Sequence, residues 1–388
     1  MNLRQTADAV GIEQYPEALE AFFEKPADMK KSLKQICFLQ EQYDLFGEFI
    51  DEAEASARQI LDDSAYCAWV ATAAAFVLES SVQQACTLPA AGGWEKPVDR
   101  WLLLHILIPQ IMASVAEYQA RGFSEDELQS LMCAYKKNIR IVARNKGKPG
   151  LDKGYYTWLC LYAKARIFEA GGFEFELRNL PAAACWLQNR STGEVLAVMC
   201  RGTFHRSGRL PLGSRNFEDE AGAFTVVFSE DAENYYGHSF VGNQVTLTAQ
   251  TFPKALWHCF AEPGTPCLSM HIPAGTDISQ PALERAFAEA RQILRQRFPE
   301  HSGDVIYCNS WLLDPKLEEL LGESSRIVGF MKRFAKFPQK DGGTAALSFV
   351  FGNVGNYADL PENTGLERKL KALYLAGNCI YAYCGIIV

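Results

Sequence analysis

Side chains able to carry out acid–base chemistry stand at the end of a short apolar run at 267–272. The run alternates, so it predicts a strand in which Cys267, Ser269 and His271 share one face. Imidazole changes its charge near neutral pH, which makes His271 the candidate general base. A lone histidine at a strand end is also commonly a structural residue that hydrogen-bonds the backbone. Both interpretations stay open on the residues alone.

A second apolar run, 305–308, is followed directly by Asn309 and Ser310. If the two runs are neighbouring parallel strands, their carboxyl ends meet at one edge of a sheet, and these polar side chains lie near His271. Cys308 could in principle pair with the imidazole as a nucleophile. Its apolar neighbours instead favour a buried thiol that behaves as a small hydrophobe.

The segment between the two runs has the pattern of a helix. Ser279 is expected as its N-cap, and Pro281 falls in the first turn, where a missing N–H costs nothing. Apolar residues then recur at helical spacing from Leu283 to Phe298. A strand–helix–strand unit of this kind predicts two parallel strands joined by a right-handed crossover.

The turn that leads into this helix is a candidate anion site. Backbone N–H groups at the start of a helix are unpaired and favour a phosphate. Gly275 allows close approach, and Thr276 and Ser279 add hydroxyls. Asp277 opposes this interpretation, because its carboxylate repels a phosphate unless it points away. The sequence has neither GxGxxG nor a Walker lysine, which removes the two commonest nucleotide motifs.

The elements around this unit fall into two regions. Residues 1–150 show apolar residues three or four apart, which predicts an all-helical domain ending at the breaker cluster NKGKPG. A second domain is expected over 155–388. It starts with one more helix, and after Gly172 the apolar period changes from helical to alternating.

Within the second region the pattern predicts several strands and one long loop. A hairpin is expected across 189–193, and Gly242-Asn243 is a two-residue turn signal. Residues 204–222, with the acidic run Glu218 to Glu220, show no period, and loops of this length are usually functional or mobile. Residues 345–351 are expected as a strand, and 327–334 as a helix.

Composition limits the function classes. The chain has 388 residues, 48% hydrophobic and 22% charged, with a net charge of −8. The charge argues against nucleic acid and membrane surfaces as partners, since both are polyanions. Twelve cysteines occur without a CxxC pair, so neither a metal site nor a disulfide scaffold is indicated, and a cytoplasmic location is expected. No signal peptide is recognisable, and the apolar stretches 66–78 and 101–115 are short for a membrane span.

A basic run precedes the expected domain boundary. Lysine and arginine recur from Lys136 to Lys148. Cations are favoured near a helix C-terminus, so a solvated helix face is the simpler interpretation, and an anion-binding site is the alternative.

Four segments carry a resemblance to a known family. They are IFEAGGFEFEL (Ile167–Leu177), LSMHIPAG (Leu268–Gly275), NSWLLDPKLEELL (Asn309–Leu321) and LPENTGLERKLKALYLAG (Leu360–Gly377). With them the chain resembles the two-domain acyltransferase-like proteins of bacteria, which join a helical N-terminal domain to a GNAT-like C-terminal domain. The family usually has an arginine in the first segment, where this chain has Glu169 and Gly172.

The resemblance implies an α+β or α/β architecture, in which a GNAT-like mixed sheet with helices on both faces follows the helical domain. In that fold two central parallel strands splay and acyl-CoA lies in the gap. The pyrophosphate would meet the turn Ile272–Ser279, held by the backbone of Ile272, Ala274, Gly275 and Thr276 and the hydroxyl of Ser279. The usual phosphate-loop consensus is missing from this turn.

The function expected from this resemblance is transfer of an acetyl or longer acyl group from acyl-CoA, without a metal, to the amine of a small molecule or peptide. His271 would act as base, and Asn309 and Ser310 would position the acceptor or donate a proton, with Tyr307 a weaker candidate acid. The alternatives are a degenerate GNAT scaffold that binds a ligand or protein partner without catalysis, and a thiol enzyme that depends on Cys308.

Overall fold

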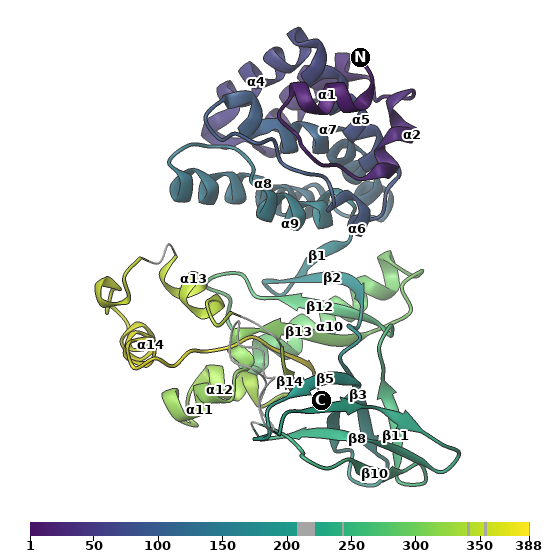
Figure 1. Cartoon of the computed structure of the whole chain (residues 1–388), viewed down its shortest axis with the longest axis vertical. Helices are drawn as coiled ribbons and strands as arrows, with labels where there is room; N and C mark the ends of the chain where they lie inside the picture. The colour runs from purple at the N-terminus through teal and green to yellow at the C-terminus, as the bar shows by residue number, and fades with distance from the viewer. Residues whose placement is uncertain (208–221, 243, 340–341, 353–354, 388) are drawn as a thin grey trace. The chain divides into compact units, whose positions relative to one another are not determined.

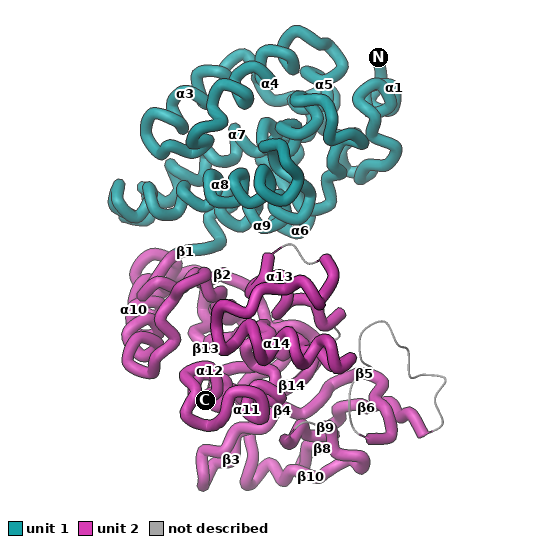
Figure 2. The backbone as a smooth tube through the Cα atoms, turned by 90° about the vertical axis from the view of Figure 1, so that its left-hand side faces the viewer, with its two compact units in different colours: residues 1–168 teal, residues 169–388 magenta. Residues whose placement is uncertain are grey.

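The computed structural model describes residues 1–207, 222–242, 244–339, 342–352 and 355–387. The chain divides into two compact units, Met1–Phe168 and Glu169–Val388, which are coloured separately in Figure 2. Each unit is described by itself below.

The first unit is helical up to the start of β1, as its apolar spacing predicts. All of residues 1–166 are described, and they contain no strand. Helix α7 lies at the centre and packs against α3, α4, α5 and α9. The helices are α1 (Leu3–Ala9), α2 (Glu20–Phe23), α3 (Ser32–Tyr43), α4 (Ile50–Asp62), α5 (Ser64–Glu79), α6 (Val82–Ala85), α7 (Pro97–Ala120), α8 (Glu125–Lys146) and α9 (Lys153–Ala163).

Helix α7 is longer than its apolar stretch suggests. Among the described residues it is the one helix long and apolar enough to cross a bilayer. Two consecutive helical segments, 47–62 and 64–79, pass the same test only when taken together, and they are bent by 105° at the break between them. In α7, 72% of the most apolar window is buried inside the structure, and its buried Gln110 donates to the Ala163 carbonyl at 2.9 Å. These are the features of a core helix.

The boundary between the units lies later in the chain than the NKGKPG breaker indicates. Helix α9 follows that breaker, yet it packs on α6, α7 and α8 of the helical unit. Burial of Tyr156, Leu159 and Tyr162 on those helices explains this placement. The breaker cluster is therefore a turn within the helical unit, and the chain passes into the second unit through β1 (Ile167–Ala170).

The second unit contains a mixed six-stranded sheet with the order β1-β2-β12-β13-β15-β14. Figure 1 labels β1, β2, β12, β13 and β14 of this sheet. The central pair, β12 and β13, is parallel, as the strand–helix–strand pattern predicts, while β2/β12, β13/β15 and β14/β15 are antiparallel. The strands are β2 (Phe173–Asn179), β12 (Pro266–His271), β13 (Val305–Ser310), β14 (Phe334–Pro338) and β15 (Tyr383–Ile387).

Helix α10 (Gln280–Arg297) makes the crossover between the two parallel strands. Its apolar side, including Leu283, Ala286 and Ala290, is buried. The turn between β1 and β2 approaches it so closely that a Cβ on Gly171 would lie 2.6 Å from that of Ala286. Gly171 also has a φ of +55°, so glycine is required there for both space and conformation.

The amino ends of the two parallel strands are held together by the loop that follows α10. Gly303 lies against the start of β12, where a Cβ would fall 1.8 Å from the Pro266 carbonyl oxygen. The Nε2 atom of His301 lies 3.1 Å from the Cys267 carbonyl oxygen. These contacts fix where β13 begins relative to β12.

A second, antiparallel sheet contains the path β10-β8-β4-β3-β11. The expected hairpin is present as β3 (Ala184–Asn189) and β4 (Val195–Met199). Trp186 of β3 links this sheet to the first one, since its indole N–H donates to the Ala335 carbonyl at 2.7 Å. The other strands are β5 (Arg201–Phe204), β6 (Phe224–Val227), β7 (Ser229–Glu230), β8 (Asn234–Val241), β9 (Gln244–Val245), β10 (Gln250–Pro253) and β11 (Trp257–Ala261).

Two loop expectations lie at or beyond the edge of the described structure. The strands β8 and β9 that flank the Gly242-Asn243 turn pair antiparallel, but Asn243 itself lies outside the described residues. Most of the long loop, with the acidic run Glu218 to Glu220, also lies outside them.

In the part of the chain after β13 that the structure describes, four α-helices form a separate core with the 3₁₀ turn at 311–313. They correct two sequence expectations. Residues 345–351 form a helix, because Ala346 and Leu347 are buried while Phe349 is 76% exposed, and the expected helix at 327–334 ends at Met331, with Phe334 opening β14. The helices are α11 (Lys316–Leu321), α12 (Arg326–Met331), α13 (Ala345–Phe351) and α14 (Gly365–Leu375).

Candidate active site

The parallel strands β12 and β13 part at their carboxyl ends. Their pairing runs from Cys267 opposite Val305 to Met270 opposite Cys308, and stops there. On its outer side each strand stays paired for longer. β12 pairs with β2 as far as His271, and β13 pairs with β15 as far as Ser310. Beyond this point the backbone groups of the two strands that face each other are not hydrogen-bonded to one another. A ligand that has amide groups of its own can bind between the strands there.

His271 lies at this parting and has a carboxylate partner. Its Nε2 atom is 3.1 Å from Oε2 of Glu176, which stands on the neighbouring strand β2. The Glu176 side chain is 13% exposed and that of His271 31%, so the pair is shielded but reachable from solvent. A carboxylate in this position orients the imidazole and stabilises it when it takes up a proton.

The polar contacts continue from Glu176 along the same face of the sheet. The Glu176 carboxylate lies 3.7 Å from the Arg178 guanidinium, which stands over the Tyr307 ring at 5.8 Å. The Tyr307 hydroxyl donates to the Cys384 sulfur at 2.8 Å, and burial raises the pKa of Tyr307 above its ordinary value. This buried hydroxyl is directed to Cys384 in the core, which weakens Tyr307 as the candidate acid.

The structure brings Asn309 to the same side of the sheet as His271 but turns Ser310 the other way. Ser269 pairs with Tyr307, so Asn309, two residues on, shares that face and is exposed. The Ser310 hydroxyl oxygen accepts the Leu312 N–H at 3.2 Å and starts the 3₁₀ turn. Asn309 is therefore the better placed of the two to meet a ligand.

Cys308 lies on the opposite face from His271. It pairs with Met270, and successive residues of a strand alternate between faces. The thiol is buried, and desolvation raises its pKa above the ordinary range. A nucleophilic pair of Cys308 with His271 is incompatible with this geometry.

The turn before α10 offers open backbone at Ala274 and Gly275. Gly275 has a φ of +84°, and nothing lies within 4 Å of where its Cβ would be. Within the described part of the chain the N–H groups of these two residues have no hydrogen-bond acceptor. Thr276 differs, because its N–H bonds the Pro273 carbonyl at 3.2 Å and its hydroxyl lies 3.0 Å from the Gly172 carbonyl.

The cap of α10 differs from the expected one. Ser279 occupies the N-cap position without a capping hydrogen bond from its side chain. Its N–H and hydroxyl both donate to the Asp277 carboxylate at 2.9 Å, and these bonds lower the pKa of Asp277. Asp277 is therefore ionised beside the turn, with the Arg326 guanidinium 3.7 Å away and Arg285 close enough to stabilise its charge.

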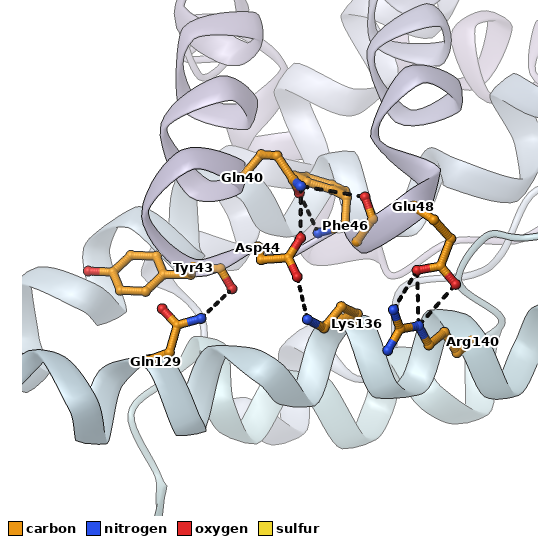
Figure 3. Close-up of polar contacts among 9 residues, drawn as sticks. Gln40, Tyr43, Asp44, Phe46, Glu48, Gln129, Lys136 and Arg140 are labelled. Atoms are coloured by element: carbon orange, nitrogen blue, oxygen red, sulfur yellow. Dashed lines mark hydrogen bonds and ion pairs between the residues drawn. The ribbon is translucent and has the colours of Figure 1, made fainter.

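Cations of the basic run in the helical unit form ion pairs, and those of Lys136 and Arg140 appear in Figure 3. Lys136 bonds the Asp44 carboxylate, and Arg140 makes a two-pronged contact with Glu48 at 2.6 and 3.0 Å. Two more lysines of the run also have acidic partners, Lys146 with Asp152 and Lys148 with Glu95. These contacts join α8 and the loop after it to neighbouring parts of the unit, which favours a structural role over an anion site.

Sequence reasoning missed Glu176. The alternation of Glu174, Glu176 and Arg178 along β2 places all three on the face that does not carry the phenylalanines, and this was the available signal. The pairing of β2 with β12 brings that face beside His271, and a pairing between distant strands has no local signature. Among the described residues, no three His, Cys, Asp or Glu side chains gather as a metal site.

Comparison with solved structures places the whole chain among acyltransferases in fold. A mutant acyltransferase in complex with octanoyl-CoA is 16% identical, with a TM-score of 0.66. An acyltransferase in complex with decanoyl-CoA is 18% identical with a TM-score of 0.65, and one with decanoyl-CoA and teicoplanin is 17% identical with a TM-score of 0.63. Each comparison covers 100% of this chain and 99% of the other.

No curated protein sequence matches the chain significantly. The family model for the GNAT-like C-terminal domain matches residues 167–387, which is the sheet-containing unit with the parting strands and their crossover helix. The chain therefore belongs to the family of proteins with a GNAT-like C-terminal domain, joined here to a helical N-terminal region.

Proposed function

We propose that this protein transfers an acyl group from acyl-CoA to an amine. The observation that carries the proposal is the parting of β12 and β13 beyond Met270 and Cys308, with His271 and its Glu176 partner beside the gap. Each parted strand has backbone groups that can pair with the amides of the pantetheine arm. The fold shared with acyltransferases that bind octanoyl-CoA or decanoyl-CoA supports acyl-CoA as the co-substrate.

The turn before α10 fits the pyrophosphate of CoA. The N–H groups of Ala274 and Gly275 are available as donors, and the open space at Gly275 admits a phosphate to the backbone. Two guanidinium groups, from Arg285 and Arg326, lie near the single carboxylate of Asp277. These cations offset the charge of Asp277, which supports an anion site at the turn.

The chemistry assigned to the site follows from its side chains. The neutral imidazole of His271 takes a proton as the amine nitrogen attacks the thioester carbonyl. The new C–N bond replaces the C–S bond, and the thiolate of CoA leaves with a proton from the solvent or the acceptor. Glu176 stabilises the imidazolium that forms, and Asn309 can donate hydrogen bonds to the acceptor from the neighbouring strand end.

The acceptor is proposed to be an amine on a small molecule or peptide. One acyltransferase of similar fold is solved with teicoplanin, which supports an acceptor larger than a simple amine. The half-exposed position of His271 at the strand ends is compatible with such an acceptor reaching the base from solvent.

Calorimetry with acetyl-, octanoyl- and decanoyl-CoA tests the co-substrate directly. We expect saturable binding of at least one, followed by release of free CoA in the presence of a panel of amines. Mass spectrometry of free CoA is preferred over thiol reagents, because the chain has twelve cysteines of its own. No binding of any of them at millimolar concentration would overturn the proposal and leave the scaffold without catalysis as the remaining interpretation.

A further inference from the structure

Three cysteines come together on the second sheet, away from the candidate active site. The sulfur atoms of Cys185 in β3 and Cys200, just after β4, lie 3.1 Å apart. Cys259 in β11 lies on the same face of the sheet, and its thiol donates to the Ala261 carbonyl at 3.6 Å. The three residues therefore form a line of thiols across neighbouring strands, with Cys185 in the middle.

Strand register explains why they meet. Cys185 pairs with Val198, and the Cys200 N–H bonds the Ala183 carbonyl at 2.9 Å, so Cys200 is the diagonal neighbour of Cys185 on one face. On the other side of β3, Cys259 pairs with Leu187, two residues along from Cys185. One hairpin thus supplies two of the sulfurs, and the more distant strand β11 supplies the third on the same face.

The three thiols differ in how easily a reagent reaches them. Cys185 is 3% exposed, whereas Cys200 and Cys259 are half-buried. The neighbouring Cys185 thiol, which has a single proton to share, lowers the pKa of Cys200 and of Cys259, while the pKa of Cys185 itself is raised. The outer two are therefore the thiols from which a reactive thiolate forms, and the central one keeps its proton.

We propose that Cys185, Cys200 and Cys259 form a thiol–disulfide site whose oxidant is a hydroperoxide. The two sulfurs of Cys185 and Cys200 need to approach by only about 1 Å to reach the length of a disulfide bond. Nothing in the acyl-transfer chemistry uses these residues, so the site is independent of the proposed function.

The reaction takes place in two balanced steps. The Cys200 thiolate attacks one oxygen of hydrogen peroxide; the O–O bond breaks, sulfenic acid forms, and hydroxide leaves as water with the thiol proton. The Cys185 sulfur then attacks the sulfenic sulfur; the S–S bond forms, the S–O bond breaks, and hydroxide leaves with the Cys185 proton. Two thiols and one peroxide yield one disulfide and two waters.

Cys259 gives the site a second pairing. Its thiolate can attack the Cys185 sulfur of the first disulfide and release the Cys200 thiolate, which moves the bond from one outer cysteine to the other. A site with only two cysteines cannot transfer its disulfide in this way. The central position of Cys185 predicts that every disulfide of the site contains it.

Trypsin separates the three residues, so the test is a peptide map of the full chain. Cleavage at the flanking basic residues gives peptides 179–190, 191–201 and 255–285, which carry Cys185, Cys200 and Cys259 in turn. The third peptide also carries the buried Cys267, so fragmentation of a linked pair is needed to show which of its two sulfurs is joined. After hydrogen peroxide, acid quench and alkylation, we expect 179–190 linked to 191–201 or to 255–285 through Cys259. Linkage should proceed about tenfold faster than oxidation of Cys67 and Cys133, half-buried cysteines of the helical unit.

Variants separate the roles. In Cys200→Ser the link should move entirely to Cys185 and Cys259, and in Cys185→Ser no link should form while dimedone traps a sulfenic acid on an outer cysteine. Cys133→Ser is the matched control and should leave the linkage unchanged. Absence of any 179–190 link in the parent chain, or a link no faster than oxidation of Cys67 and Cys133, overturns the proposal without relying on a variant.

Discussion

The Glu176 carboxylate lies 3.1 Å from Nε2 of His271, although 95 residues separate the two in the chain. The antiparallel pairing of β2 with β12 places Glu176 opposite Ser269, one step from His271 along the same face. The contact directs the Nε2 atom of His271 toward the Glu176 carboxylate and so fixes the orientation of the ring.

Removing the His271 imidazole should lower the rate of catalysis more than removing the charge of Glu176. We expect His271→Ala to lower kcat about 100-fold or more, and Glu176→Gln to lower it about tenfold with KM nearly unchanged, because the amide keeps a polar contact but not the negative charge. Steady-state rates with decanoyl-CoA and an accepted amine measure both. Glu194→Gln, in the exposed β3–β4 turn, is the charge-matched control. A folded His271→Ala variant with parental turnover would exclude His271 from the mechanism.

Substitution of Gly275 should interfere with CoA binding through charge. Gly275→Glu places a carboxylate where the phosphate is expected. We predict that the dissociation constant for CoA, measured by calorimetry, rises at least tenfold. Gly275→Ala is the control for backbone strain at a φ of +84°, which costs about 1 kcal/mol of stability but adds no charge. Equal CoA affinity in Gly275→Glu and Gly275→Ala would place the phosphate site elsewhere.

Asp277 should oppose the binding of CoA, and its neutralisation should help. Asp277→Asn keeps an oxygen that can accept from Ser279 while removing the ionised carboxylate. We expect CoA to bind about two- to fivefold more tightly at low salt, with the gain shrinking as salt screens the charge. A weaker affinity in this variant would show that Asp277 organises the turn more than it repels the ligand.

The close approach of Gly171 to α10 predicts a difference between two adjacent glycines. Both Gly171 and Gly172 have positive φ, but an added Cβ meets Ala286 at 2.6 Å in the first case and only the Thr276 methyl at 3.9 Å in the second. Gly171→Ala should therefore lower the free energy of unfolding by about 2 kcal/mol more than Gly172→Ala. Urea denaturation measures this difference, and equal losses would show that α10 shifts freely.

Lys336 should make stability depend on pH in the alkaline range. Burial lowers its pKa from the ordinary 10.5 to about 8. Between these values the unfolded chain holds more protons than the folded one, so the contribution of Lys336 to stability rises with pH. Lys336→Met removes the burial penalty, so its advantage over the parent should be largest at pH 7 and shrink by at most about 3 kcal/mol as pH rises to 10.5.

Denaturation midpoints of the parent and Lys336→Met at pH 7, 8, 9 and 10 provide the measurement. The comparison cancels the titration of the other lysines and tyrosines. A constant difference across this range would mean that the Lys336 ammonium keeps its hydration in the folded chain.

The sequence predicted the parts of the fold that have a local signature. The alternation at 267–272, the Pro281 start and the apolar face from Leu283 are enough to define the parallel pair and its crossover, and they also locate His271 at a strand end. The apolar run at 345–351 was ambiguous, because a short run without polar interruption suits a strand or a helix, and only packing on the C-terminal helices decides it.

The partners within the candidate site were harder to predict. Ser279 has the residue type of a capping group, but Asp277 lies two residues before it and takes up its hydroxyl, a competition that propensity does not resolve. Glu176 and His271 meet through the pairing of β2 with β12, and the strands β3 to β11 lie between these two in the chain. Cys185 and Cys200 stand on the two strands of the predicted hairpin, whereas the pairing of β11 with β3, which brings Cys259 beside them, has no local signature.

The approach of Gly303 to the Pro266 carbonyl, together with the His301 contact, gives the parallel pair a mechanical asymmetry. The two strands are fastened at their amino ends, so any change in the width of the gap must be made at the end that carries His271 and Asn309. A larger side chain at 303 would displace the amino ends of β12 and β13 from each other. Its effect on a bound ligand would appear at the carboxyl ends, one full strand length away.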